Sequence, residues 1–518
     1  MKSTAPGQSP QEIELKLALP MADPSSLARL LARVPILARR KPTRQTLHNV
    51  YYDTPEQILH QQRVALRIRR VGSDAAPRWL QTLKTGDRGH SALSQRGEWE
   101  VGVPSPTLAR EALTATPWAK IDPDDTVFPS LAPAFLTTFE RTLWVVRRRD
   151  ASVVEVALDI GHITAGEKDV PICELELELL AGPSTALFDI AHQIARTIAV
   201  LPLSKSKSER GYALAQNCLD APLHAHPPTL TKNLSVPKAA ACVLGEMFCQ
   251  FTTNLIAVRS SDDPETVHQT RIGWRRFRSA VRLFQPAVAM DAVPAWQPLH
   301  MLLGLLGELR DLDVACTDTL PALAQAYSAG DAQRADAWQA MAHSLQHAAD
   351  LQRKSVRYAL LEPAVGATLL ATTQWLEGLA ALPGPGGVQG EPTGSLRRWS
   401  RLRMARMHRQ LKRARQDSGS PDSQHRVRIL AKRMRYGIEA LVHCLPQRRA
   451  KHWYRQATGL QLRLGAERDV VQAGLLAAKY EVDRGLVGFL QGVAVGRAMH
   501  SAGHSSGGKK EVRLKSHS

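Results

Sequence analysis

The sequence predicts a multidomain α+β protein. Its first part is expected to form an eight-stranded antiparallel β-barrel with flanking helices, and its second part an all-α domain of two repeated helical bundles. Three observations lead to this prediction. The chain has 518 residues, more than one domain usually contains. Short alternating segments fill residues 11–214, and helical periodicity with an internal repeat fills the chain from about residue 236 onward.

Eight segments of the first part alternate apolar and polar residues. In chain order they are IELKLAL, HNVYYDT, VALRIRR, RWLQTLKT, GEWEVGV, ERTLWVVRR, VVEVALDIG and ICELELELL. A period of two, interrupted by Gly, Pro and Asp turns, is typical of antiparallel strands, and eight strands suffice to close a barrel. Apolar residues recur every three or four positions in Ser25–Arg33 and Ser184–Ala199, which predicts helices there.

A Pro- and His-rich segment, Ala221–Pro228, separates this part from a sequence rich in Ala, Leu, Gln and Arg, and Pro383–Gly394 interrupts the latter. The expected boundaries are 10–218 for the first domain, 219–234 for a linker, 235–500 for the helical domain with halves at about 235–380 and 395–500, and 501–518 for a disordered tail.

One pattern occurs twice in the helical domain. HQTRIGWRRFR at 268–278 aligns without gaps onto HRVRILAKRMR at 425–435, and LGELRD at 306–311 matches LGAERD at 464–469. The offsets are 157 and 158 residues, so two related bundles are expected.

The charge is divided unequally between the two parts. The 67 Lys and Arg against 48 Asp and Glu leave a formal net charge of +19. Residues 1–220 hold 27 basic and 25 acidic side chains, whereas residues 221–518 hold 40 and 23. Such an excess indicates a polyanionic partner: nucleic acid, an acidic membrane surface or phosphates.

Cysteine usage and hydropathy favour a soluble cytoplasmic protein. The six cysteines show no CxxC spacing, which argues against a zinc site and a disulfide scaffold. The N-terminus lacks an apolar leader, and no run of about 18 apolar residues occurs. We therefore expect neither secretion nor a membrane span.

Two acidic motifs lie on predicted strands far apart in the chain. Their charged residues, each set on one face of its strand, are Glu12, Glu14 and Lys16, and Glu174, Glu176 and Glu178. Like charges at this spacing repel unless a cation lies over them, and dense carboxylates suit Mg²⁺ or Mn²⁺. Taken alone, ExExK is typical of a half-buried strand with its charges in water.

The other segments supply the opposite charge. Their basic residues are Arg67, Arg69, Lys84, Arg96, Arg141, Lys205 and Lys207. If these faces line one barrel, its lumen is charged all round, which is costly without a ligand. The alternative is an apolar lumen into which Ile13, Leu15, Leu175 and Leu177 point. Acids on the first and late strands and bases on the middle ones favour a lumen that holds an anion beside a metal.

The motifs ExExK, YYDT, LRIR, TLKT, RGEWE, EVALDIG, ELELE and SKSERGY occur in this order within residues 10–218 and resemble the CYTH superfamily, the triphosphate tunnel metalloenzymes. The resemblance implies an eight-stranded tunnel that binds a triphosphate with Mg²⁺ or Mn²⁺. Implied metal ligands are Glu12, Glu14, Glu174, Glu176, Glu178 and Asp159, with the three late glutamates competing for a matching pair. The implied catalytic residues, which would bind the phosphate oxygens, are Lys16, Arg67, Arg69, Lys84, Arg141 and Lys205. The implied substrate-binding residues are these six together with Arg96 and Lys207. Glu98, Glu100 and Glu155 would be further lumen carboxylates, and His48 a structural residue.

The duplicated pattern places basic side chains on one stripe of each helix, because they recur at spacings of three and four. The stripes are His268, Arg271, Arg275, Arg278 and Arg282 in one copy, and His425, Arg428, Lys432 and Arg435 in the other. A solvated basic face or a nucleic-acid-binding helix would look the same, but duplication favours a shared binding surface. The run from Arg397 to Arg415 adds to the positive field.

This half resembles the CHAD domain over residues 235–500. The resemblance implies binding of inorganic polyphosphate by the two stripes. The pairs Arg310-Asp311 and Arg468-Asp469 are expected to form internal ion pairs rather than to contact ligand.

Together these inferences predict a hydrolase: a metal-dependent inorganic triphosphatase that converts tripolyphosphate to pyrophosphate and phosphate, with a basic module that binds polyphosphate. Alternatives are an adenylate cyclase or thiamine triphosphatase on the same tunnel, or a non-enzymatic protein of polyphosphate granules. Nucleic acid is not expected as partner, because aromatic residues are sparse at 5% and no recognition motif occurs. The sequence leaves the oligomeric state and the choice between Mg²⁺ and Mn²⁺ open.

Overall fold

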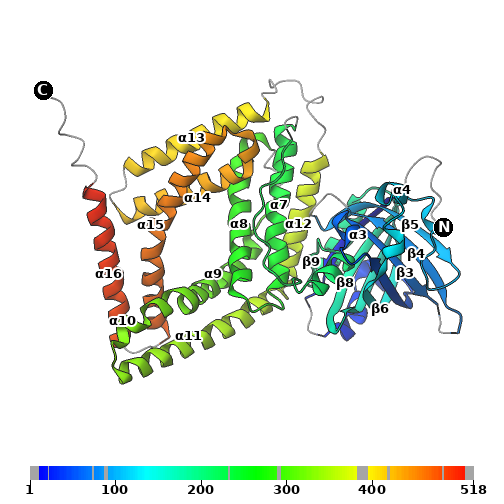
Figure 1. Ribbon diagram of the computed structural model, residues 1–518, viewed down its shortest axis with the longest axis horizontal. Helices are drawn as coiled ribbons and strands as arrows, with labels where there is room; N and C mark the ends of the chain where they lie inside the picture. Colours follow the sequence, from blue (N-terminus) through cyan, green and yellow to red (C-terminus); the bar gives the residue numbers. More distant parts are fainter. Residues whose placement is uncertain are drawn as a thin grey trace.

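The structure of the chain is a computed structural model (Figure 1). It describes residues 11–20, 23–72, 75–86, 91–231, 234–288, 293–381, 395–416, 420–480 and 484–507. The whole of the Pro383–Gly394 break and residues 508–518 of the predicted tail lie outside the described residues.

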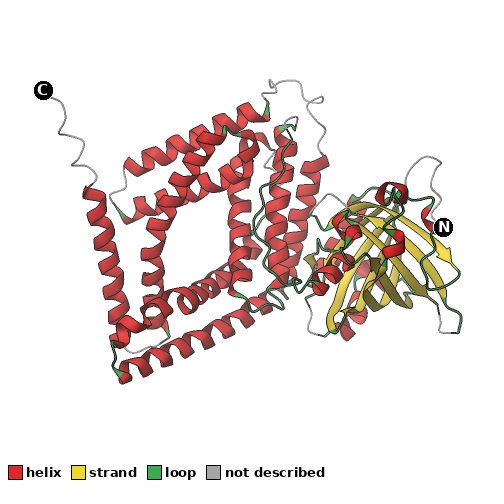
Figure 2. Cartoon of the chain, viewed as in Figure 1, coloured by secondary structure: helices red, strands yellow, loops and turns green. Residues whose placement is uncertain are grey.

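The first part is a closed antiparallel barrel (Figure 2). Its strands are β1 (Gln11–Ala18), β2 (Thr43–Asp53), β3 (Val64–Val71), β4 (Arg78–Thr85), β5 (Leu93–Val103), β6 (Ala132–Arg147), β7 (Val153–Ala165) and β8 (Lys168–Ala181). The order is β5-β4-β3-β2-β6-β7-β8-β1, and β1 pairs with β5 to close the ring. A short strand, β9 (Leu201–Pro202), adds to β1. The predicted eight-stranded barrel is confirmed.

Short helices surround the barrel and cover its apolar outer face. They are α1 (Leu27–Leu31), α2 (Pro35–Ala38), α3 (Ile58–Gln61), α4 (Trp118–Ile121) and α5 (Thr185–Ala195). A further helix, α6 (Lys207–Ala215), packs instead on the inner face of the barrel, where Tyr212 contacts Phe135. Leu15, Leu175 and Leu177 are fully buried in one cluster with Ile190 of α5, outside the barrel. The apolar lumen is therefore excluded, because these leucines already have helices to pack against.

The second part is helical. Its helices are α7 (Val236–Ala257), α8 (Pro264–Phe284), α9 (His300–Val314), α10 (Ala324–Ser328), α11 (Ala332–Ala359), α12 (Pro363–Ala381), α13 (Leu396–Gln416), α14 (Pro421–Leu441), α15 (Gln447–Lys479) and α16 (Arg484–Gly507). The duplicated stripe lies on α8 and α14, and the second repeated motif on α9 and α15. Helix α16 continues past the expected domain end at residue 500.

Helix α7 is long and apolar enough to cross a membrane, but 72% of its most apolar window is buried inside the protein. Its buried side chains, including Phe251 and Leu255, belong to the core of the helical domain. The helix therefore has the environment of a core helix.

The two parts pack against each other through α12 (Figure 1). Leu370 of α12 belongs to the core cluster outside the barrel, and Gln374 Oε1 accepts a hydrogen bond from Nε2 of His192 of α5 at 2.8 Å. The contact is close, since a Cβ on Gly366 would lie 2.1 Å from the carbonyl oxygen of Val200. A glycine is thus required where α12 crosses the backbone that leads into β9.

Candidate active site

The barrel encloses a cavity of about 950 Å³ whose lining is mostly charged. The predicted residues that line it are Glu12, Glu14, Arg67, Arg69, Lys84, Arg96, Glu98, Glu100, Arg141, Glu155, Glu176, Glu178 and Lys207. They come from seven of the eight strands and from α6, because alternation points every second side chain inward. The predicted charged lumen is present.

One wall of the tunnel carries carboxylates on three neighbouring strands. Glu14 of β1 lies opposite Glu178 of β8, and Glu178 lies opposite Glu155 of β7. Side chains directly opposite on paired strands have Cβ atoms about 5 Å apart. These three carboxylates therefore form a row of hard oxygen donors across the wall.

The facing wall carries cations. Arg69 donates from Nε to Oδ1 of Asn49 at 2.8 Å, and its closest carboxylate contact, to Glu100, is 3.9 Å long. Burial, together with repulsion from Arg67 and Arg141, lowers the pKa of Arg69 to about 10. The guanidinium is thus largely desolvated and lies near two other arginines, with one long carboxylate contact, and a bound anion would stabilise it.

Arg96 and Lys84 connect the two walls. Arg96 donates to Glu12 at 2.9 Å and to Glu14 at 2.5 Å, and Lys84 lies 2.8 Å from Glu12 and 3.0 Å from Glu98. Burial alone would raise the pKa of Glu12, but Lys84 and Arg96 lower it to about 2. These carboxylates are therefore ionised, with cations as their present partners.

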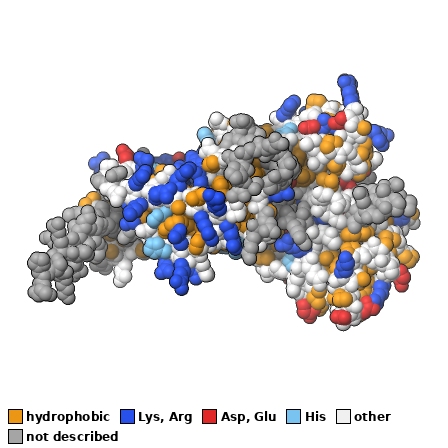
Figure 3. Space-filling model, turned by 90° about the horizontal axis from the view of Figure 1, so that it is seen from above, with side chains coloured by type: hydrophobic (Ala, Val, Ile, Leu, Met, Phe, Trp, Pro, Cys, Tyr) orange, Lys and Arg blue, Asp and Glu red, His pale blue; other side chains and the backbone are white. Residues whose placement is uncertain are grey.

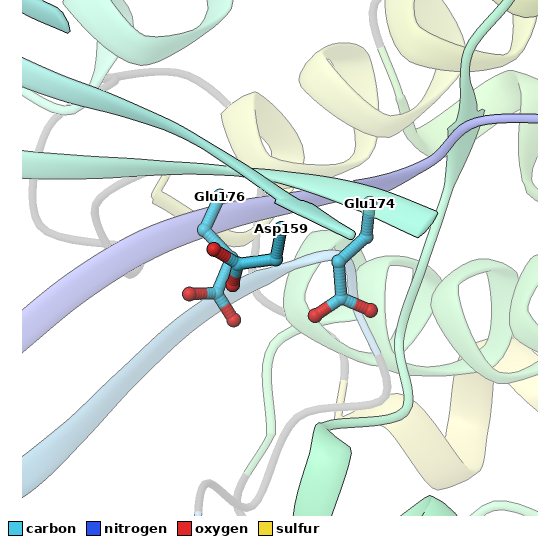
Figure 4. Close-up of side chains that lie close together, drawn as sticks. All are labelled: Asp159, Glu174 and Glu176. Atoms are coloured by element: carbon cyan, nitrogen blue, oxygen red, sulfur yellow. The ribbon is translucent and has the colours of Figure 1, made fainter. Parts of the chain in front are cut away.

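A second acidic cluster, Asp159, Glu174 and Glu176, has carboxylate oxygens within 4.8 Å of one another (Figure 4). Lys207 Nζ lies 2.6 Å from Asp159 and 2.8 Å from Glu176, and it also pairs with Glu174. Neither Asp159 nor Glu174 lines the tunnel cavity. Lys207 is thus the present partner of all three carboxylates, and the assignment of Asp159 and Glu174 as metal ligands stays a prediction.

Two predicted phosphate-binding lysines also lie elsewhere. Lys16 is buried and donates to Glu14 at 3.0 Å and to the Ser94 hydroxyl at 3.2 Å, so it supports a carboxylate without lining the cavity. Lys205 lies outside the tunnel, with Nζ 3.4 Å from the carbonyl oxygen of Leu219. His48 Nδ1 lies 3.2 Å from the Thr138 hydroxyl, and its structural role stays a prediction.

The sequence analysis did not predict the structural role of Asp53 in the YYDT motif, which is to accept hydrogen bonds from two helices. Its Oδ1 accepts the backbone N–H groups of Thr54 and Leu59, and its Oδ2 accepts the N–H of His60 and the hydroxyl of Tyr212. Asp53 thus caps α3 and fastens α6, which carries Lys207 to the tunnel. The motif SKSERGY contains both Lys207 and Tyr212. Their spacing within one motif could have indicated that the helix is held in place by Asp53 and supplies Lys207 to the tunnel.

The helical domain has a second charged cavity, of about 250 Å³. Its lining residues are His268, Arg271, Arg275, Arg310, Asp311, Val314, Arg428, Lys432, Asp469 and Gln472. The two repeated helices and the two RD motifs therefore converge on one place. Arg310, Asp311 and Asp469 line this cavity rather than lying apart from it, and the side chain of Arg468 lies outside the described residues.

Several stripe residues do not reach this cavity. Arg278 stacks over Trp296, with 5.1 Å from its guanidinium carbon to the ring centroid, and Arg435 lies 3.5 Å from Glu439. The other predicted stripe residues outside the lining are Arg282 and His425. Burial, with repulsion from Arg310, lowers the pKa of His268 to about 4. His268 is therefore neutral at pH 7.

Basic side chains also gather on the face that contains α13 (Figure 3). Helix α13 has no acidic residue, and its exposed cations include Arg397, Arg401, Arg406 and Arg409. None of these four has a salt bridge to any described residue. The excess charge of the second half is thus largely uncompensated on this face.

Fold and site together define a charged β-tunnel followed by a basic helical domain. The sequence pattern of the CYTH domain matches residues 10–212, and that of the CHAD domain matches residues 242–478. The chain therefore belongs to the proteins that join a CYTH domain to a CHAD domain.

Known proteins resemble each half separately. The inorganic triphosphatase of Haemophilus influenzae (strain Rd) is 36% identical over 205 residues, which are 39% of this chain, and the match spans 55% of that protein. The CHAD domain structure from Ricinus communis is 30% identical, with 54% of this chain and 92% of that chain covered and a TM-score of 0.46. HpAC1 from Hippeastrum, for which a dominant triphosphatase activity is described, is 19% identical, with coverages of 39% and 95% and a TM-score of 0.30.

Proposed function

We propose that the tunnel is the active site of a metal-dependent inorganic triphosphatase, which hydrolyses tripolyphosphate to pyrophosphate and phosphate. The observation that carries the proposal is the charged cavity, in which Arg67 and Arg69 of β3 lie across the barrel from the carboxylate row and Arg141 of β6 lies beside it. A phosphate chain needs cations along its oxygens, and its hydrolysis needs a charged site closed to bulk solvent. The 36% identity to an inorganic triphosphatase over the barrel supports this reading.

The carboxylate row fits a hard divalent cation. Its donors are all oxygens, as Mg²⁺ and Mn²⁺ prefer. Glu155 has no hydrogen bond or salt bridge to any described residue, so its oxygens remain available. We assign Glu14, Glu155 and Glu178 as principal ligands, with Glu12 and Glu176 beside them. When bound, the ion would polarise the phosphoryl oxygens and help to activate water.

The chain's own residues would bind and orient the substrate. Arg67, Arg69 and Arg141 would neutralise the phosphate oxygens and hold the terminal phosphorus for in-line attack by water. Glu98, which lies 3.0 Å from Lys84 and 3.8 Å from Arg67, would keep both cations in place. The protein thus supplies position and charge rather than a covalent nucleophile.

Cyclase and thiamine triphosphatase activities are less well supported. Both substrates carry a ring that needs an apolar or stacking surface. Among the described lining residues, the only aromatic side chains are Tyr51 and Phe139. Tyr51 is buried and accepts from Arg67, and Phe139 lies beneath Arg141 and Lys207. Neither ring is free to stack on a substrate.

The cavity between α8 and α14 is proposed to bind inorganic polyphosphate. Its three arginines from the repeats and Lys432 converge from two helices, which suits successive phosphates of one chain. A cytoplasmic location at polyphosphate granules follows from this proposal. Microscopy of a fluorescent fusion would check it, and uniform fluorescence in granule-containing cells would contradict granule association.

The decisive assay is phosphate release by the full chain from tripolyphosphate, ATP, thiamine triphosphate and long polyphosphate, each with Mg²⁺, Mn²⁺ or EDTA. We expect tripolyphosphate to be preferred and EDTA to abolish turnover. Absence of tripolyphosphate hydrolysis with either metal would refute the proposal. Faster turnover of ATP or thiamine triphosphate would establish one of the alternatives instead.

A further inference from the structure

A third cavity, of about 590 Å³, lies between the barrel and the helical domain, and neither proposed activity uses it. Its walls come from β1, β8 and α6 on one side and from the ends of α7 and α11 on the other. Its chemistry divides into a cationic part and an apolar part.

The cationic part holds two half-buried charges without a salt bridge. Arg259 donates to the carbonyl oxygen of Leu19 at 3.2 Å, and Lys205 has only the carbonyl oxygen of Leu219 at 3.4 Å. Within the described part of the chain, neither side chain has a carboxylate at salt-bridge distance. Half-buried cations without an anion are costly, which favours an anionic ligand.

Other residues of the lining strengthen this positive field. Arg210 pairs with Glu174, yet its Nε is buried and has no partner. Lys354 is exposed at the cavity, and Asp220 is the one acidic side chain among the described lining residues. Arg357 is already engaged by Asp262. Lys205, Arg259 and Lys354 are therefore the groups available to an anion.

The apolar part consists of Leu203, Leu219, Ile256 and Leu361, together with Tyr358. Tyr358 lines the cavity and is 72% exposed, so its ring stands at the rim. An exposed aromatic ring next to cations is suited to stacking on a flat ring that carries a phosphate. Inorganic phosphate or polyphosphate would leave this apolar wall without a partner.

We propose that the interdomain cavity binds a nucleotide-like ligand, with its phosphate on Arg259 and Lys205 and its ring against Tyr358. The site is separate from the tunnel, so the proposal does not depend on triphosphatase activity. Arg210 lines the cavity and pairs with Glu174, which pairs with Lys207 of the tunnel. A ligand phosphate in the cavity would therefore compete for a cation that also holds the tunnel's acidic cluster.

Binding of AMP to the full chain, measured by isothermal titration calorimetry, tests the proposal. AMP is used because it lacks the triphosphate that the tunnel is proposed to bind. Arg259→Gln and Lys205→Gln should each weaken AMP binding at least tenfold, and Tyr358→Ala severalfold. Lys205 and Tyr358 are not core residues, so loss of binding in their variants does not depend on misfolding.

Two controls distinguish the cavity from other basic surfaces. Arg69→Gln in the tunnel and Arg401→Gln on α13 should leave AMP affinity unchanged. Adenosine and inorganic phosphate should each bind at least tenfold more weakly than AMP, because each fills half of the site. Absence of AMP binding at millimolar concentration overturns the proposal, as does binding that Arg69→Gln abolishes. Phosphate binding as tight as AMP, insensitive to Tyr358→Ala, overturns the nucleotide assignment.

Discussion

Replacing Lys207 with methionine tests the charge pairing inside the tunnel, because this one ammonium contacts Asp159, Glu174 and Glu176. Methionine keeps most of the side chain's length and removes its charge. The lysine side chain is 7% exposed, so water cannot take its place. Removing one partner of a buried pair costs about 3–5 kcal/mol. Arg141 and Arg210 still neutralise part of the cluster, which favours the low end of this range.

The assay is thermal unfolding followed by circular dichroism. A loss of about 3 kcal/mol corresponds to a melting temperature lower by about 6–12 °C for a domain of this size. Lys205→Met is the matched control, because Lys205 lies two positions earlier and has only a carbonyl contact at 3.4 Å. Its effect should stay within about 0.5 kcal/mol. Equal destabilisation by the two variants would refute the pairing argument.

The pH dependence of the stability difference between the wild type and Lys207→Met provides a second check. Burial would lower the pKa of Lys207, but the three carboxylates raise it above the ordinary lysine value of 10.5. The charged Lys207 therefore stabilises the fold fully below pH 10.5. The difference in free energy of unfolding between the wild type and Lys207→Met should not change between pH 7 and pH 9. In the wild type the pKa of Glu176 is lowered, so stability is lost as pH falls below its ordinary value of 4.5. The variant should lose less free energy of unfolding in acid than the wild type does. The difference in free energy of unfolding between the two proteins should therefore become smaller below pH 4.5, and an unchanged difference at pH 4 would contradict the reasoning.

Four further substitutions test the other assignments. Glu14→Gln should lower metal-dependent phosphate release at least 100-fold with an unchanged circular dichroism spectrum, and activity within tenfold of wild type would remove Glu14 from the ligand set. Arg69→Gln should raise the KM for tripolyphosphate about tenfold or more, since a charge-assisted hydrogen bond contributes about 1.5–3 kcal/mol; an unchanged KM would contradict contact with substrate. Lys432→Gln should weaken polyphosphate binding and reduce its salt dependence, measured by filter retention at several salt concentrations; an unchanged salt slope would exclude a phosphate contact. Asp53→Ala should lower the free energy of unfolding by about 2–4 kcal/mol in urea titrations, because four donors lose their acceptor; a loss below about 1 kcal/mol would contradict its capping role.

Strand alternation made the barrel and much of its lining predictable. In β1 and β8 a period of two separates the glutamates from Leu15 and Leu175, so the two sets must face opposite sides. Alternation cannot say which set is inside. The segregation of acids and bases suggested the charged interior, and the structure agrees because α1, α2 and α5 cover the leucines.

The predictions from the sequence failed where the chain changes from strand to helix periodicity, and where segments distant in sequence come into contact. Ser206 caps α6 with Glu209, so the chain becomes helical at Lys207, and strand alternation no longer relates Lys205 to Lys207. One lysine enters the tunnel and the other faces the helical domain. The pairing of Lys207 with Asp159, and the meeting of the two RD motifs at one cavity, depend on tertiary packing that no local pattern encodes.

The internal pairing also explains why the barrel half is nearly neutral although a strongly anionic substrate is proposed for it. Arg96 and Lys84 hold Glu12 and Glu14, so a phosphate chain alone would have to draw cations away from buried carboxylates. A divalent ion alone would have to displace the same cations. With both bound, the carboxylates would hold the ion and the cations released from them would bind the phosphate oxygens, so that no buried charge would be left without a partner. Binding of metal and substrate is therefore expected to be mutually dependent in the tunnel. By contrast, the exposed side chains of Arg397, Arg401, Arg406 and Arg409 on α13 can attract a polyanion without any metal.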